Sequence, residues 1–273
     1  MTPELQSLLP AALAVAREAG NEILRIYGSA TVQVEWKDDQ SPLTAADRAA
    51  HEVIVRGLRA LTPGVPVWSE ESAEIPYTER AGWPRFWLVD PLDGTKEFIK
   101  RNGEFTVNIA LVEQHSPVLG IVHVPALGRD YFGADQLGAF RADAGGAARR
   151  IQVRRPAARP PRIAGSRSHG GDSLQAFLAA VGPHELVSMG SSLKFCLVAE
   201  GAADVYPRLG PTAAWDTAAA QAVVEAAGGA VVDLAGAPLR YNRHARVLNP
   251  HFVAYGDADP DWVAVLGATG TSR

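Results

Sequence analysis

The chain contains little cysteine and no positive charge in its first residues. Its 273 residues include a single cysteine, Cys196. One thiol excludes a disulfide framework and a cysteine-based zinc site, and it fits a reducing compartment. The first residues, Met-Thr-Pro-Glu, lack the positive charge with which secretory signals begin. We therefore expect a soluble protein of the cytoplasm.

An excess of basic charge and a long uninterrupted apolar run are also missing. The formal net charge is −4, which argues against a nucleic-acid footprint over the whole surface. The most apolar long stretch, 217–237, is interrupted by Gln221 and two acidic residues, so we expect no integral membrane segment. With 47% hydrophobic and 21% charged residues, the chain is typical of one large globular domain or two closely packed ones.

Apolar periodicity and turn residues predict the order of the elements. Helices are predicted from about Pro10 to Gly28, over 44–61, from Asp93 onward, and over 172–181, 191–200 and 213–227. Strands are predicted over 32–36, 65–68, 86–89, 107–112, 118–124, 131–133, 138–141, 163–165, 185–189, 203–207 and 230–234. The runs between 107 and 141 predict an antiparallel meander. The alternation of strands and helices after 163 is typical of an α/β fold.

The segment 149–162 separates these two patterns and is rich in arginine and proline. A nucleic-acid patch is one interpretation, but the net negative charge of the chain favours a solvated crossing. We therefore divide the chain into an N-terminal half, 1–150, and a C-terminal half, 151–273.

Two carboxylates follow the apolar run 86–89. Asp90 ends this run, and Asp93 comes three residues later, where Gly94 and Thr95 are expected to open a helix. Amides at a helix start attract anions, and carboxylate oxygens suit a divalent cation that bridges to a phosphate. Taken alone, the two aspartates could equally be turn and cap residues.

Further carboxylates stand at the ends of other predicted elements. Glu70 follows the preceding strand, and Asp216 opens an alanine-rich helix, where an N-cap role would also explain it. Because such ends converge in α/β folds, one metal site explains Glu70, Asp216 and the aspartate pair together. Asp47 lies three residues after Thr44, the position of a capping-box acid, which is a sufficient structural reason for it.

Longer motifs resemble the inositol monophosphatase superfamily of lithium-sensitive, magnesium-dependent phosphatases. The segments Trp-Leu-Val-Asp-Pro-Leu-Asp-Gly-Thr at 87–95 and Trp-Asp-Thr-Ala-Ala-Ala at 215–220 are similar to its two signatures. Residues 41–47 and 69–72 fall where the family has its other motifs. The resemblance spans nearly the whole chain. It implies an α/β fold, a layered α-β-α-β-α sandwich of the inositol monophosphatase and fructose bisphosphatase type.

Finer features are similar to one branch, the bacterial CysQ-type 3′(2′),5′-bisphosphate nucleotidases. They lie in 95–110, 166–169, 190–196, 206–212 and 248–250. The resemblance implies a role in sulfur metabolism, the Mg²⁺-dependent removal of the 3′-phosphate from adenosine 3′,5′-bisphosphate. The sulfated relative of that nucleotide is a further candidate substrate.

The resemblance also implies roles for individual residues. Two to three Mg²⁺ ions would be held by Glu70, Asp90, the Leu92 carbonyl oxygen, Asp93 and Asp216. The catalytic set would be Asp47, Thr95 and Glu70, with Asp47 and Thr95 orienting or deprotonating the attacking water. Substrate contacts would come from Glu70, Leu92, Asp93, Gly94, Thr95, His169, Ser191, Lys194, Arg208 and Asp216. Positive charge at Lys194 and Arg208 suits a second phosphate.

Three rival functions make different demands on these residues. The same chemistry on inositol monophosphate or a sugar phosphate would have no use for Lys194 and Arg208. A haloacid-dehalogenase-type phosphatase needs Asp-x-Asp-Gly-Thr, and the spacing from Asp90 to Asp93 is one residue too long for it. A non-catalytic nucleotide sensor would not need the complete set of carboxylates, and absence of phosphate release would favour it. The sequence does not predict an oligomeric state.

Overall fold

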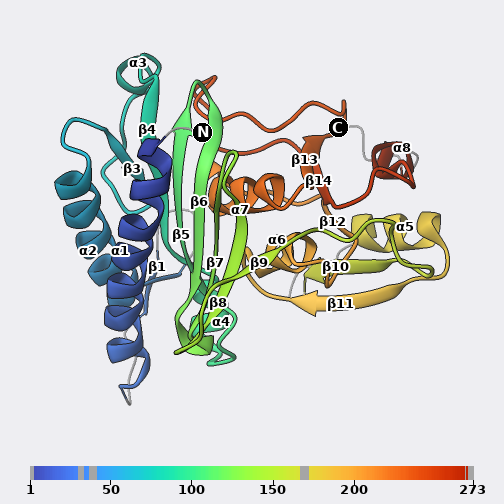
Figure 1. The fold of residues 1–273 in the computed structure, drawn as a ribbon, viewed down its shortest axis with the longest axis horizontal. Helices are drawn as coiled ribbons and strands as arrows, with labels where there is room; N and C mark the ends of the chain where they lie inside the picture. Colours follow the sequence, from blue (N-terminus) through green and yellow to red (C-terminus); the bar gives the residue numbers. More distant parts are fainter. Residues whose placement is uncertain (1–2, 30–33, 37–41, 167–171, 268, 270–273) are drawn as a thin grey trace.

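The structure is a computed structural model that describes residues 3–29, 34–36, 42–166, 172–267 and 269. Its elements form five layers, in the order helices, sheet, helices, sheet, helices (Figure 1). This is the layer order predicted for an α-β-α-β-α sandwich. Among the described helices, none has the length and apolar character needed to cross a bilayer.

The first helix layer and the larger sheet come from the beginning of the chain. Helices α1 (Pro3–Tyr27) and α2 (Ala45–Leu61) pack together on one face of this sheet. The sheet contains, in spatial order, β3 (Val67–Ser69), β4 (Arg85–Asp93), β5 (Thr106–Glu113), β6 (Ser116–Val124), β7 (Arg129–Ala134), β8 (Gly138–Asp143) and β9 (Arg149–Ile151). Neighbours from β4 to β9 are antiparallel, which confirms the predicted meander and extends it at both ends. Among the described strand pairs of this sheet, β3–β4 alone is parallel.

The middle layer consists of α6 (Leu193–Ala199) and α7 (Ala214–Ala226). Helix α7 contacts strands of both sheets, and its small side chains let it approach the larger sheet closely. At Gly120 of β6, an added Cβ atom would lie 2.0 Å from the carbonyl oxygen of Ala219. A side chain at that position would therefore force α7 away from the sheet.

The smaller sheet and the last helix layer come from the end of the chain. The sheet contains, in spatial order, β11 (Glu185–Met189), β10 (Arg162–Ser166), β12 (Val205–Arg208), β14 (Phe252–Tyr255) and β13 (Ala230–Asp233). Strand β10 pairs in parallel with both neighbours, whereas β14 is antiparallel to both of its own. Helices α5 (Asp172–Val181) and α8 (Trp262–Gly267) cover its outer face (Figure 1). The division at residue 150 stays a prediction.

The first helix begins earlier than its proline suggested. The predicted start near Pro10 is wrong, because α1 begins at Pro3 and carries Pro10 in its interior. Leu9 and Leu13 on either side of Pro10 are buried against the core. Tertiary burial of this amphipathic face therefore outweighs the hydrogen bond that proline removes.

Several short elements had no sequence prediction. They are β9, β14, α8, α3 (Tyr77–Arg80), β2 (Pro42–Thr44) and the 3₁₀ turn η1 (Pro125–Leu127). Strand β9 lies in the segment 149–162, which was predicted to be a solvated crossing. Strand β1 (Val34–Trp36) pairs antiparallel with β2 and is the described part of the strand predicted over 32–36. Each of these elements has too few residues to show a periodicity of its own.

Candidate active site

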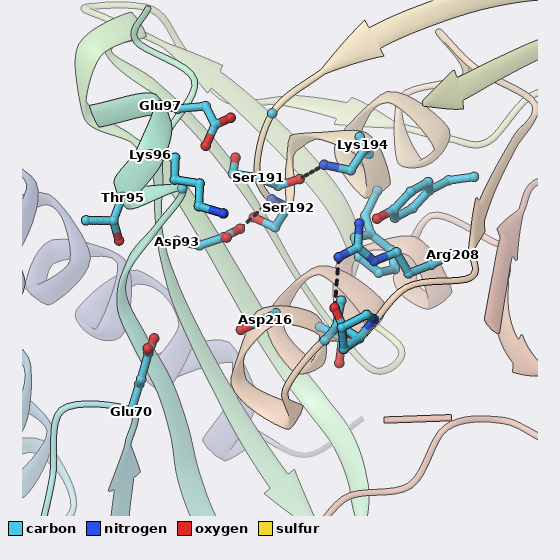
Figure 2. A pocket seen from close by; sticks show the side chains of 17 residues that line it. Glu70, Asp93, Thr95, Lys96, Glu97, Ser191, Ser192, Lys194, Arg208 and Asp216 are labelled. Carbon is cyan, nitrogen blue, oxygen red and sulfur yellow. Dashed lines mark hydrogen bonds between the residues drawn. The ribbon is translucent and has the colours of Figure 1, made fainter. Parts of the chain in front are cut away.

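A cavity of about 430 Å³ opens where the end of β4 meets the start of α7 and the segment before α6 (Figure 2). Its acidic lining residues are Glu70, Asp93, Glu97 and Asp216, and its basic lining residues are Lys96, Lys194 and Arg208. Residues far apart in the sequence thus contribute opposite charges to one cavity. Of the predicted site residues, Gly94, Thr95 and Ser191 also line it, whereas His169 lies outside the described residues.

The turn that carries the two aspartates is built around a glycine. Strand β4 continues to Asp93 instead of ending at Asp90, with an irregular register between the two. The Leu92 amide donates to Asp90 Oδ1 at 3.0 Å. Gly94 then adopts a left-handed φ of +90° and caps α4 (Thr95–Ile99). The strand-to-helix transition was predicted correctly, but the cap is Gly94 and not Asp93.

Asp93 is held in place by the C-terminal half of the chain. The Ser192 amide donates to Asp93 Oδ2 at 2.5 Å. In the same segment, the Gly190 amide donates to Glu104 Oε2 at 2.8 Å. The loop 190–192, which joins β11 to α6, is therefore fastened to the N-terminal half by two carboxylates.

Asp47 and Asp216 occupy the same position in two different helices. Each is the third residue of its helix and accepts a hydrogen bond from the amide before the helix, from Thr44 to Asp47 Oδ2 at 2.8 Å and from Ala213 to Asp216 Oδ2 at 2.9 Å. Thr44 Oγ1 also donates to Asp47 Oδ2 at 2.6 Å, so the predicted capping box of α2 is confirmed. The N-cap residue of α7 is Ala213, so the interpretation of Asp216 as an N-cap is wrong. Among described contacts, Oδ1 of Asp47 and Oδ1 of Asp216 accept no hydrogen bond.

Burial and mutual repulsion disfavour the charged form of these carboxylates. Burial is the main cause that raises the pKa of Asp90 and Asp93 and brings the pKa of Asp216 to about 8. Glu70 adds to the shift at Asp90 and at Asp216. Lys194 lowers the pKa of Asp93, and Arg208 lowers that of Asp216, without cancelling the rise. A divalent cation would relieve this repulsion.

The carboxylate end fits a hard divalent cation by its donor chemistry. All of its groups are oxygen donors, and the Leu92 carbonyl faces the same turn, where it accepts a hydrogen bond from Thr95 Oγ1 at 3.3 Å. In Figure 2, Glu70 stands on β3's side of the cavity, apart from Asp93 and Asp216. Within the described chain, no group of three or more His, Cys, Asp or Glu side chains is arranged so that it could hold one metal ion. Side-chain rotation would therefore have to complete a coordination shell.

Asp47 is a buried carboxylate on which the charges of Glu70 and Glu71 act. It is buried, and burial raises its pKa to about 6, with smaller contributions from Glu71 and Glu70. The hydrogen bonds from Thr44 act in the opposite direction. A carboxylate with a pKa near the working pH is suited to accept a proton from water. No hydrogen bond joins Asp47 to Thr95 in the part of the chain that the structure describes.

Two basic residues of the cavity, among those that the structure describes, donate hydrogen bonds to backbone carbonyl groups. Lys194 is buried, and its Nζ donates to the Ser191 carbonyl at 2.6 Å and more weakly to that of Met189 at 3.4 Å. Burial lowers the pKa of Lys194 to about 8. Arg208 donates to the Pro211 carbonyl at 2.8 Å.

Lys96 was not among the predicted site residues. It is exposed on α4 and lines the cavity. Its position directly after Thr95, within a segment assigned to the site, could have indicated that Lys96 lines the cavity.

Comparisons with known proteins show the family of this chain. The model of the inositol monophosphatase family matches residues 4–260. The chain is 53% identical over 239 residues to "3′(2′),5′-bisphosphate nucleotidase CysQ" of Salmonella typhimurium, a match that covers 87% of this chain and 95% of that protein. The protein of the same name from Escherichia coli K12 matches with the same identity and coverage.

Solved structures show the same relationship. CysQ from Bacteroides thetaiotaomicron, a bacterial member of the inositol monophosphatase family, has 45% sequence identity and a TM-score of 0.82, over 92% of this chain and 97% of that one. The predicted family and the predicted layered fold are thereby confirmed. This chain belongs to the inositol monophosphatase family.

Proposed function

We propose that this chain is a Mg²⁺-dependent 3′(2′),5′-bisphosphate nucleotidase that hydrolyses adenosine 3′,5′-bisphosphate to AMP and phosphate. The observation that supports this proposal is the polarity of the cavity, which has carboxylates at one end and the cations Lys194 and Arg208 at the other. Hydrolysis of a monoester needs only the carboxylate end, whereas a second phosphate requires cations outside it. Relatives with this name are 53% identical over 87% of the chain.

The carboxylate end would hold two to three Mg²⁺ ions. The proposed ligands are Glu70, Asp90, the carbonyl oxygen of Leu92, Asp93 and Asp216. When bound, Mg²⁺ supplies Lewis-acid stabilisation of phosphoryl charge and makes water easier to deprotonate. Li⁺ should inhibit by competing for the carboxylates of Asp90, Asp93 and Asp216, since it is a hard cation of lower charge.

The chain's own residues would position water and substrate. Asp47 Oδ1 is available to accept a proton from the attacking water, because Oδ2 already accepts both bonds from Thr44. Thr95, close to Leu92, would orient that water through its hydroxyl. The amides of Gly94 and Thr95 would bind the phosphate that is hydrolysed. The remaining substrate contacts, including a second phosphate, are assigned to His169, Ser191, Lys194 and Arg208, with the sulfated nucleotide as a further substrate.

Phosphate release from a panel of phosphomonoesters tests the proposal. The panel contains adenosine 3′,5′-bisphosphate, adenosine 3′-monophosphate, inositol 1-phosphate and a sugar phosphate, each with Mg²⁺ and with a chelator. We expect the highest kcat/KM for the bisphosphate and no turnover with the chelator. A preference for inositol or sugar phosphate would replace the proposed substrate. Binding of the bisphosphate without phosphate release would favour a nucleotide sensor.

A further inference from the structure

The three basic side chains that line the cavity in the described part of the chain are not equally available to a ligand. Lys194 is 5% exposed, and its Nζ already donates to two carbonyl groups of the segment that precedes α6. One terminal nitrogen of Arg208 donates a hydrogen bond to the Pro211 carbonyl. Both side chains therefore help to hold the loops that form the cavity wall, whatever else they bind.

Lys96 has the opposite character. It belongs to the exposed residues of α4, and within the described residues its ammonium group forms no hydrogen bond and no ion pair. Figure 2 shows the side chain extending from α4 into the cavity, on the side where Ser191 and Ser192 form the wall. A lysine ammonium on a flexible stem can turn toward an anion without breaking an existing contact.

The ammonium group of Lys96 can bind an anion of the substrate if no carboxylate of the cavity already pairs with it. No ion pair joins Lys96 to Asp93 or Asp216 in the described structure, although all three line one cavity. The cations whose charges lower the pKa of Asp93 and Asp216 are Lys194 and Arg208 respectively. Figure 2 shows Lys96 beside Thr95 and Asp93, with its ammonium group directed into the cavity. Because no carboxylate of the described residues pairs with this ammonium group, it is available to an anion of the substrate.

We propose that Lys96 is a specificity-determining residue whose ammonium group binds the second, non-hydrolysed phosphate of the substrate. This inference rests on the proposed bisphosphate nucleotidase function. Lys96 is then an adaptable cation that closes on the phosphate from α4. Selection between a bisphosphate and a monophosphate then depends on a residue that the carboxylate chemistry does not use.

Three variants of the full chain test the assignment. Lys96→Met removes the ammonium group and keeps the length of the side chain, and Lys96→Arg keeps a positive charge. Lys100→Met is the matched control, because Lys100 is an exposed lysine at the end of the same helix and does not line the cavity. The measured quantity is the ratio of kcat/KM for adenosine 3′,5′-bisphosphate to that for adenosine 3′-monophosphate. A second readout is the Kd of adenosine 5′-monophosphate, measured by calorimetry without Mg²⁺.

A charge-assisted contact to phosphate sets the expected size of the effect. Lys96→Met should lower the kcat/KM ratio roughly ten- to a hundredfold and weaken binding of adenosine 5′-monophosphate by a similar factor. Lys96→Arg should recover most of both values. Lys100→Met should match the unsubstituted chain in both measurements.

Three other outcomes would contradict the role of Lys96, the proposed function, or both. An unchanged ratio in Lys96→Met overturns the assignment of Lys96 and leaves the proposed function intact. An equal fall for both substrates also overturns it, because Lys96 would then act on the hydrolysed phosphate or on the fold. If the unsubstituted chain itself shows no preference for the bisphosphate, the proposed function and the role of Lys96 fall together.

Discussion

The two ends of the cavity are fixed by different parts of the molecule. At the carboxylate end, Asp93 and Asp216 each accept a hydrogen bond from a backbone amide, so the main chain determines where their oxygens lie. At the basic end, Lys194 and Arg208 donate to loop carbonyls, whereas Lys96, which Figure 2 shows beside Thr95 and Asp93, has no such contact among the described residues. The difference separates two tasks. Chemistry would use carboxylates that are hydrogen-bonded to the main chain, and substrate selection would also use Lys96, whose side chain can still turn.

The largest expected effect removes one charge from the carboxylate end. Asp93→Asn keeps the shape of the side chain and can still accept a hydrogen bond from Ser192, but it loses a proposed metal ligand. We expect phosphate release to fall by about a hundredfold or more, since metal stabilisation of the transition state amounts to several kcal/mol. Asp135→Asn, an exposed aspartate outside this cavity, is the control. Near-normal turnover in folded Asp93→Asn would contradict the ligand assignment.

The two ends should also respond to pH in opposite directions. The pKa of Asp216 is raised to about 8 in the folded chain, so the folded state binds more protons than the unfolded state between about pH 4 and pH 8. Without Mg²⁺, the free energy of unfolding should therefore fall as pH rises through this window, by at most about 1.4 kcal/mol per pH unit for one proton. Asp216→Asn should flatten the fall in urea titrations. A slope identical to that of the unsubstituted chain would show that Asp216 does not carry it.

At the basic end, the free energy of unfolding should change with pH in the opposite direction and over a narrower pH range. The pKa of Lys194 is lowered from 10.5 to about 8, so the unfolded state binds more protons between those values. The free energy of unfolding should therefore rise as pH increases from about 8 to 10.5, and Lys194→Met should remove this rise. Lys96→Met serves as the comparison, since Lys96 is exposed. If both variants lose the rise equally, burial of Lys194 is not its cause.

The smallest expected effect concerns the cap beside the proposed base. Thr44→Val removes the hydroxyl that donates to Asp47 and should cost about 0.5–2 kcal/mol of stability. Because that bond lowers the pKa of Asp47, its loss should move the acidic limb of the kcat/KM profile to higher pH. Thr44→Ser should keep the limb in place. A profile that does not move in Thr44→Val would argue against Asp47 as the base.

The carboxylate end could be predicted from sequence because strand and helix ends determine it. Asp90 and Asp93 follow a buried apolar run, and Asp216 lies in the first turn of a long alanine-rich helix. These elements bring Asp93 and Asp216 to one cavity, but among the described residues a shared metal would still require side-chain rotation, which the sequence does not predict. The same reasoning predicted the meander, since each strand has a clear apolar run with a short turn after it.

The remaining features depend on tertiary contacts that no local pattern contains. Pro10 sits inside α1 because buried leucines on both sides stabilise the longer helix. Strand β14 has four residues, too few to predict without the neighbours that pair with it. That Lys194 points to a carbonyl group and Lys96 into the cavity depends on rotamers, which sequence spacing does not determine.

The hydrogen bond from the Ser192 amide to Asp93 joins the two halves of the chain at the proposed metal site. Separation of the halves would break this bond and expose the amide to solvent. Amide hydrogen exchange at Ser192 therefore reports the position of a carboxylate that lies 99 residues earlier in the chain. A cation that binds at Asp93 should slow exchange at Ser192 by favouring the joined state, which makes this amide a probe of metal occupancy that needs no substrate.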